Sequence, residues 1–207
     1  ALVLAILARR ARMSWSMLIG PPLDADHLPL LWIVLPLAGV MLGAFSLLWG
    51  PLSYVIPDVV QRWAVEGMPE LLTAGHPLWM LSEAVLIVVV APVMEEILFR
   101  GVLLHRWAHR WGLRTAVIAT SVAFGILHVE PVGHVVFGLT MCALYFSTGS
   151  LWAPIAAHMV NNGLVVLAML PSALRGETRD EITLEEIRSD LWQWAALFVV
   201  GMAIAIW

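Results

Sequence analysis

Six stretches of this sequence are apolar over about the length that a helix needs to cross a lipid bilayer. A hydrocarbon core of about 30 Å requires about 20 apolar residues in a helix. The stretches cover residues 28–50, 78–104, 114–128, 132–147, 151–170 and 191–207. They predict an all-α fold, a polytopic transmembrane helical bundle of about six spans, organised as a single domain over residues 1–207.

Composition supports this class of protein. Hydrophobic residues make up 61% of the 207 residues and charged residues 13%, whereas a soluble domain is about half apolar and about a quarter charged. We therefore expect an integral membrane protein with the lipid bilayer as its surroundings. The net charge of −4 comes without a basic patch, which argues against nucleic acid as a partner. A single cysteine, Cys142, excludes an internal disulfide.

The segment 51–77, between the first two stretches, is more polar. Its apolar residues, among them Val55, Val59 and Trp63, recur at helical spacing, which predicts a helix lying on the membrane surface. An ordinary connecting loop is the alternative. The apolar residues 1–8 predict an interfacial helix or the end of a longer segment.

Arginine placement predicts the orientation of the spans, because arginines accumulate on the cytoplasmic side. Two clusters are separated by two predicted spans, so both fall on that side. They are Arg9, Arg10 and Arg12 before the first stretch, and Arg106, Arg110 and Arg114 after the second. The net acidic linker 171–190 then lies outside, and the C-terminus returns to the cytoplasm.

Two adjacent carboxylates and an arginine interrupt the second stretch. An ionisable group at the bilayer centre costs roughly 2.5–3.5 kcal/mol on insertion scales, so such groups usually face the protein interior and serve a function. Glu96 and Arg100 are four residues apart and share a helix face, where they can form an ion pair. Glu95 diverges from Glu96 by about 100° and is left free. Pro92 is expected to kink the helix just before them.

Two later stretches carry pairs of motif residues at the same four-residue spacing. Phe124 and His128 share one helix face, and so do His158 and Asn162, with Asn161 somewhat to the side. With a rise of 1.5 Å per residue, Glu95, His128 and His158 fall in one layer near the middle of the membrane. We expect these groups to meet. The other histidines near these stretches, His105 and His134, are expected to be structural hydrogen-bonders or interfacial groups.

Such a set supports the activation of a water molecule. A carboxylate that is kept from full solvation can act as a general base, and a neutral imidazole can orient the water. A second imidazole and an amide can donate hydrogen bonds to an oxyanion. Ser121 and Cys142 have no base at a suitable spacing, so the pattern indicates a peptide hydrolase without a serine or cysteine nucleophile. Zinc held by Glu95, His128 and His158 is an alternative, although no His-Glu-x-x-His is present.

These motifs resemble the CAAX-protease and bacteriocin-processing (CPBP or Abi) family of intramembrane proteases. The matching elements are Glu95-Glu96-x-x-x-Arg100, Phe124-x-x-x-His128 and His158-x-x-x-Asn162, and the stretch 147–154 is also similar to bacterial members. The resemblance covers roughly residues 81–167, with a catalytic core at about 78–170. It implies a helical bundle with a cavity reached from the membrane or the cytoplasm, and a prokaryotic inner (plasma) membrane location.

The resemblance also implies roles for the motif residues. Glu95 would activate water with help from His128, while His158 and Asn162 would stabilise the oxyanion. Glu96, Arg100 and Phe124 would support the geometry. The choice of Asn162 over Asn161 rests on the family's spacing. Members have been regarded both as zinc enzymes and as glutamate proteases, and we favour the metal-free form with no cofactor.

The substrate is expected to be a peptide or protein. By analogy with the family it is either lipidated or membrane-anchored, as for prenyl-protein endopeptidases, or an unmodified peptide or sorting signal, as for bacterial members. A different function on the same fold is a non-catalytic membrane partner, such as an immunity or scaffold protein. A transporter with a buried carboxylate is a more distant alternative.

Overall fold

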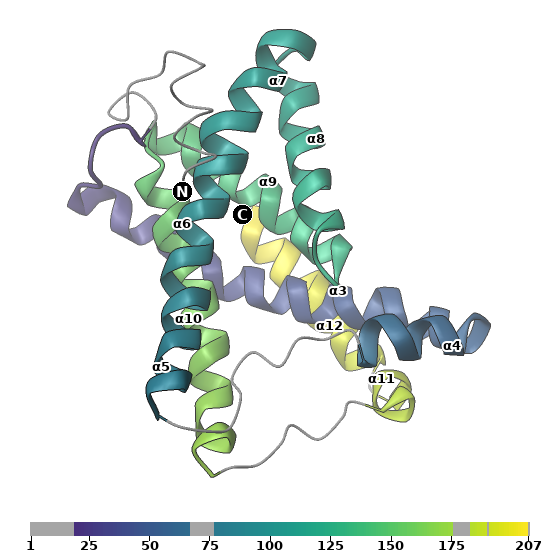
Figure 1. Cartoon of the computed structure of the whole chain (residues 1–207). Helices are drawn as coiled ribbons and strands as arrows, with labels where there is room; N and C mark the ends of the chain where they lie inside the picture. The colour runs from purple at the N-terminus through teal and green to yellow at the C-terminus, as the bar shows by residue number, and fades with distance from the viewer. Residues whose placement is uncertain (1–18, 67–76, 176–182, 190, 207) are drawn as a thin grey trace.

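The computed structural model describes residues 19–66, 77–175, 183–189 and 191–206, and all regular structure within these ranges is helical (Figure 1). The all-α fold class is therefore confirmed. The expected interfacial helix at residues 1–8 and the cluster at Arg9, Arg10 and Arg12 lie outside the described residues. The helices, of which η1 is 3₁₀ and η2 to η4 are π-helical, are η1 (Ala25–Ile33), α3 (Val34–Val55), α4 (Pro57–Val60), η2 (Gln61–Val65), α5 (Pro77–Val85), η3 (Leu86–Val90), α6 (Ala91–Glu96), η4 (Ile97–Leu103), α7 (Leu104–Trp111), α8 (Leu113–Ile126), α9 (Pro131–Thr148), α10 (Trp152–Leu174), α11 (Leu184–Ser189) and α12 (Leu191–Ile206).

Four helical stretches of the described chain are long and apolar enough to cross a membrane. They run over Ala25–Val55, Pro77–Trp111, Pro131–Thr148 and Trp152–Leu174. The other two predicted spans form shorter apolar helices, α8 and α12. With 14 residues, α8 extends only about 21 Å along its axis. The protein is thus an integral membrane helical bundle, and its described residues include four helices long enough to cross the membrane and two shorter apolar ones.

The first long helix ends later than expected from the sequence. The apolar stretch predicts an end at Gly50, before Pro51, but α3 continues through Pro51 to Val55. It stops at Ile56, whose φ of −135° and ψ of 59° are non-helical. Ile56 precedes Pro57, and the residue before a proline is disfavoured in helical conformation. Of the predicted surface helix at 51–77, only the short α4–η2 segment forms a separate helix among the described residues, and 67–76 lie outside them.

Buried side chains from five helices form the largest core. They are Val34 and Leu37 of α3, Phe99 of η4, Phe124 of α8, Phe137, Met141 and Leu144 of α9, and Ala153 and Ala157 of α10. The long helix α5–α7 runs beside α10, whereas α3 crosses behind them with α12 packed along it (Figure 1). This arrangement directs the polar faces of α6, α8 and α10 toward one region.

Glycines allow α3 and α12 to pack in close contact, as small residues do between membrane helices. A Cβ atom on Gly43 would lie 2.5 Å from the Trp194 carbonyl oxygen and 2.6 Å from Phe198 Cβ. A Cβ on Gly39, one turn earlier, would meet only the Leu197 carbonyl oxygen at 3.6 Å.

Gly43→Ala is therefore expected to destabilise the protein by about 1–3 kcal/mol through overpacking. Gly39→Ala is the matched control, because both substitutions bring the same helix-propensity gain on the same helix. Thermal unfolding of both purified variants in one detergent measures the difference. Equal melting temperatures would contradict the close α3–α12 packing.

The helix that carries the two carboxylates contains two π-helical segments. Pro92 does not end the helix. Instead η3 precedes it, and the Ala91 N–H donates to the carbonyl oxygen of Leu86 five residues earlier. The second segment, η4, follows directly after Glu96 and contains Arg100. Such π-helical turns are rare and often lie at functional sites. Here they flank the carboxylate pair on both sides.

Candidate active site

The expected ion pair between Glu96 and Arg100 is present. Arg100 Nη1 lies 2.9 Å from Glu96 Oε1, and Arg100 Nη2 donates to the carbonyl oxygen of Gly138 on α9 at 2.9 Å. Both side chains are buried, with 0% and 1% of their surface exposed. Burying a charge is tolerated when the charge is paired and hydrogen-bonded. The pair therefore anchors α6 and η4 to α9 inside the bundle.

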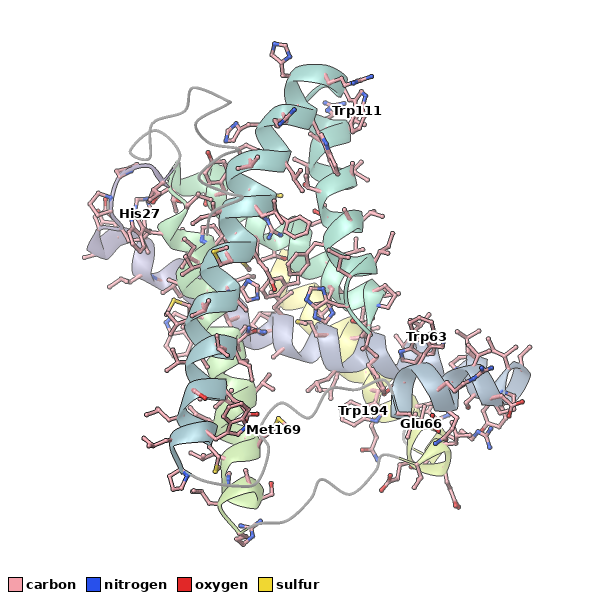
Figure 2. All side chains as sticks on the ribbon, in the orientation of Figure 1. His27, Trp63, Glu66, Trp111, Met169 and Trp194 are labelled. Atoms are coloured by element: carbon pink, nitrogen blue, oxygen red, sulfur yellow. The ribbon has the colours of Figure 1, made fainter. Side chains whose placement is uncertain are left out.

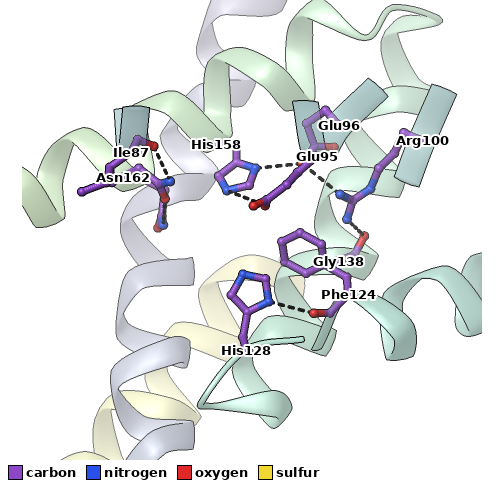
Figure 3. A network of polar contacts seen from close by, with 10 residues as sticks. Ile87, Glu95, Glu96, Arg100, Phe124, His128, Gly138, His158 and Asn162 are labelled. Atoms are coloured by element: carbon purple, nitrogen blue, oxygen red, sulfur yellow. Dashed lines mark hydrogen bonds and ion pairs between the residues drawn. The ribbon is translucent and has the colours of Figure 1, made fainter. Parts of the chain in front are cut away.

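His158 lies between the two carboxylates (Figure 3). Its Nδ1 donates to Glu96 Oε1 at 2.9 Å, and its Nε2 is 3.8 Å from Glu95 Oε2. Because Glu96 accepts as a carboxylate, it determines which imidazole nitrogen carries a proton and leaves Nε2 directed toward Glu95. One buried carboxylate thus orients the imidazole toward the other carboxylate.

Glu95 and Glu96 have different environments although they are neighbours in sequence. The Glu95 side chain is 32% exposed, whereas the Glu96 side chain is fully buried. The arginine pairs with Glu96, as the four-residue spacing predicts, and Glu95 faces His158. Two carboxylates held in distinct environments can serve distinct roles, one structural and one as a proton acceptor.

His128 faces this group from the opposite wall, on the turn after α8 (Figure 3). Its Nδ1 donates to the carbonyl oxygen of Phe124 at 2.8 Å, which leaves Nε2 as the nitrogen that can contact water or substrate. The Phe124 ring lies between the two walls. Its centroid is 4.5 Å from the His128 ring and 6.0 Å from the His158 ring, and the Arg100 guanidinium carbon lies 5.0 Å from it. Phe124 thus lies next to Arg100, His128 and His158.

Asn162 lies one turn after His158 on α10 and contacts the π-helical segment η3. Its Nδ2 donates to the carbonyl oxygen of Ile87 at 3.0 Å. The Asn161 amide in turn donates to Asn162 Oδ1 at 3.3 Å. The structure therefore brings together Glu95, Glu96, Arg100 and His158, places His128 opposite them, and holds Asn162 against the helix just before Pro92.

His134 has a closer relation to the site than the sequence suggested. Its ring stacks on His128 with centroids 4.0 Å apart and planes 15° apart. Its Nδ1 donates to the carbonyl oxygen of Glu130 at 2.6 Å, and the Glu130 carboxylate caps α9 by accepting from the Gly133 N–H at 2.8 Å. His105 is a structural hydrogen-bonder as expected, with Nε2 2.8 Å from the Tyr145 hydroxyl. The four-residue spacing of Glu130 and His134 was the available signal for this support.

The three residues of the zinc alternative do not form a metal-ligand set. Within the described chain, no three His, Cys, Asp or Glu side chains gather in an arrangement that could hold a metal ion. His128 and His158 each donate the Nδ1 proton to a carbonyl or carboxylate oxygen, which leaves both Nε2 atoms available as acceptors or ligands. These hydrogen bonds therefore do not distinguish zinc from the metal-free form, and metal independence stays a prediction.

A hollow of about 720 Å³ lies between η2 and the turn that joins α8 to α9, and His128 forms part of its wall. Trp49, Trp63 and Leu127 contribute apolar surface, and Arg62 contributes the cationic group. Trp63 projects from η2 on the side that faces the end of α8 (Figure 2). The hollow is large enough for several side chains of a peptide.

Comparison with known proteins agrees with the motif assignment. Residues 77–164 match the family described as Type II CAAX prenyl endopeptidase Rce1-like, and this range contains all three motifs. This segment is similar to the Rce1-like family. The resemblance to CPBP proteases predicted from the motifs is thereby confirmed.

The Rce1-like segment accounts for α5 to α9 and the first half of α10. A relative named "Putative membrane peptidase YdiL", from Bacillus subtilis (strain 168), is 28% identical over 152 residues. The aligned part is 71% of this chain and 59% of the relative, so the chain spans less than two thirds of that protein's length. No solved structure matches the chain at a significant level.

Proposed function

We propose that this protein is an intramembrane endopeptidase in which Glu95 activates the water that attacks a peptide bond. The observation that carries the proposal is that the two neighbouring carboxylates have different environments and partners. Glu96 is buried and paired with Arg100, whereas Glu95 is partly exposed and faces His158. The Rce1-like family match and the name of the Bacillus relative support a peptidase.

The proposed reaction begins with a water molecule between Glu95 and His128. Glu95 removes a proton from this water as its oxygen attacks the peptide carbonyl carbon, and His128 Nε2 orients the water. The carbonyl oxygen becomes an oxyanion, which accepts hydrogen bonds from the Asn162 amide and from His158 when its Nε2 carries a proton. Glu95 then returns the proton to the leaving nitrogen as the C–N bond breaks.

The proposed substrate is a peptide or protein in a membrane-anchored or lipidated form. The apolar walls of the hollow beside His128 suit such a segment, and the family description names prenyl endopeptidases. We place the protein in a prokaryotic inner membrane with the C-terminus in the cytoplasm. Arg110 in the last turn of α7 and Arg114 in the first turn of α8 lie on either side of the same turn, which supports this proposed orientation.

Wild-type protein in proteoliposomes is expected to cleave a membrane-anchored peptide from a panel of prenylated and unmodified sequences. Cleavage should persist after treatment with a strong zinc chelator, and elemental analysis should find less than one zinc per chain, because Glu95 activates the water without a metal in the proposed mechanism.

Activity that is lost on chelation and restored by zinc would overturn the glutamate mechanism in favour of a metalloprotease. Absence of cleavage across the panel, together with peptide binding, would instead indicate a non-catalytic scaffold or immunity protein.

A further inference from the structure

The carbonyl oxygen of Ile87 has an unusual position in the helix that carries Glu95. In a π-helical turn, an N–H donates to the carbonyl five residues earlier, as the Ala91 N–H does to Leu86. The next donor in this register would be residue 92, which is a proline and has no N–H. The Ile87 carbonyl therefore lacks its backbone donor in this register.

The side chain of Asn162 supplies the missing hydrogen bond. Its Nδ2 donates to Ile87 O at 3.0 Å across the contact between α10 and η3 (Figure 3). Asn161 donates to Asn162 Oδ1 at 3.3 Å, which assigns the oxygen and nitrogen ends of the Asn162 amide. In a lipid environment each unsatisfied backbone group is costly, so this bond ties the two helices together.

The position of the hydrogen bond from Asn162 to the Ile87 carbonyl matters for the site. Asn162 lies one helical turn after His158 on α10, and Ile87 lies about two turns before Glu95. His158 must lie between Glu95 and Glu96 to contact both carboxylates, and this depends on the register of α10 against α6. A fixed hydrogen bond between α10 and η3 fixes that register.

We infer that Pro92 is a positioning residue. By leaving the Ile87 carbonyl without a backbone donor, it creates the acceptor that holds Asn162 and aligns His158 with the two carboxylates. The bond occupies one N–H of the Asn162 amide, and the second N–H remains for the oxyanion. The expected effect on catalysis rests on the proposed function, whereas the hydrogen bond between α10 and η3 does not.

Pro92→Ala is the central variant, because it returns an N–H that can donate to the Ile87 carbonyl in place of Asn162. We expect kcat to fall by about 10-fold to 100-fold, since small misplacements of reacting groups have effects of this size. KM should change little, because the altered contacts act in the transition state. The readout is peptide cleavage in proteoliposomes, corrected for the folded fraction.

A double-mutant cycle of melting temperatures tests the hydrogen bond from Asn162 to the Ile87 carbonyl without reference to activity. Asn162→Leu should lower the melting temperature by several degrees in the wild-type background, where it leaves the partly buried Ile87 carbonyl without its donor. In the Pro92→Ala background Asn162→Leu should lower the melting temperature clearly less, because the new N–H of residue 92 donates to the Ile87 carbonyl. Pro51→Ala is the matched control, since Pro51 also lies inside a long helix, α3, but is exposed. In that background Asn162→Leu should cost as much as in the wild type.

Equal costs of Asn162→Leu in the wild-type and Pro92→Ala backgrounds would overturn the inference, and so would an unchanged kcat in Pro92→Ala. Failure of the proposed function has a different signature. A fully active Glu95→Gln variant would refute the catalytic proposal, while the coupling between Pro92 and Asn162 in melting temperature would persist and support the tie.

Discussion

Replacing Glu95 by glutamine is expected to lower kcat by about 10²-fold to 10⁴-fold, the usual contribution of a positioned general base. Glutamine has nearly the same shape but cannot take a proton from water. The melting temperature should stay close to that of the wild type, because the Glu95 side chain is partly exposed and Arg100 pairs with Glu96 instead. Cleavage rates in proteoliposomes and thermal unfolding of the same preparation measure the two quantities.

Glu66→Gln is the matched control for this experiment. It removes one carboxylate charge at an exposed position at the end of η2, away from Glu95 and His158, and should leave kcat unchanged. A Glu95→Gln protein that cleaves at the control's rate would contradict the assignment of Glu95 as the base.

Replacing Arg100 by leucine is expected to destabilise the protein by about 3–5 kcal/mol. The substitution leaves the fully buried Glu96 carboxylate without its cation and removes the donor to the Gly138 carbonyl oxygen. It also removes the guanidinium group next to the Phe124 ring. Denaturation of the purified variant in detergent should therefore begin at a much lower temperature than for the wild type.

The double variant Glu96→Leu/Arg100→Leu separates loss of the pair from loss of one partner. It should recover a large part of the stability lost in Arg100→Leu, because no uncompensated charge remains buried. Activity should not recover, since His158 loses the carboxylate that orients it. An Arg100→Leu variant as stable as the wild type would show that the buried ion pair does not stabilise the bundle.

The features that the sequence predicted correctly depend on positions close together in the chain. The pairing of Glu96 with Arg100 follows from the four-residue spacing on one helix, and the helical class follows from the apolar stretches. The segment 77–164 of the Rce1-like family was recognisable for the same reason, since each motif lies within one helix or its end.

The features that were missed depend on contacts between segments far apart in the sequence or on helix ends. The predicted end of α3 at Gly50 was wrong, because the helix continues through Pro51. It ends at Val55, because Ile56 precedes Pro57 and is not helical. The stacking of His134 on His128 requires the turn between α8 and α9, which residue spacing does not describe. The bond from Asn162 to the Ile87 carbonyl joins residues 75 positions apart.

The central place of Phe124 has a consequence for the width of the site. The Phe124 ring lies next to Arg100 and His158 on one side and next to His128 on the other. A phenyl ring is rigid, so it acts as a spacer of constant size. Lipids of different chain length can change the tilt of the long helices, but the spacer should keep the gap between the carboxylates and His128 nearly constant.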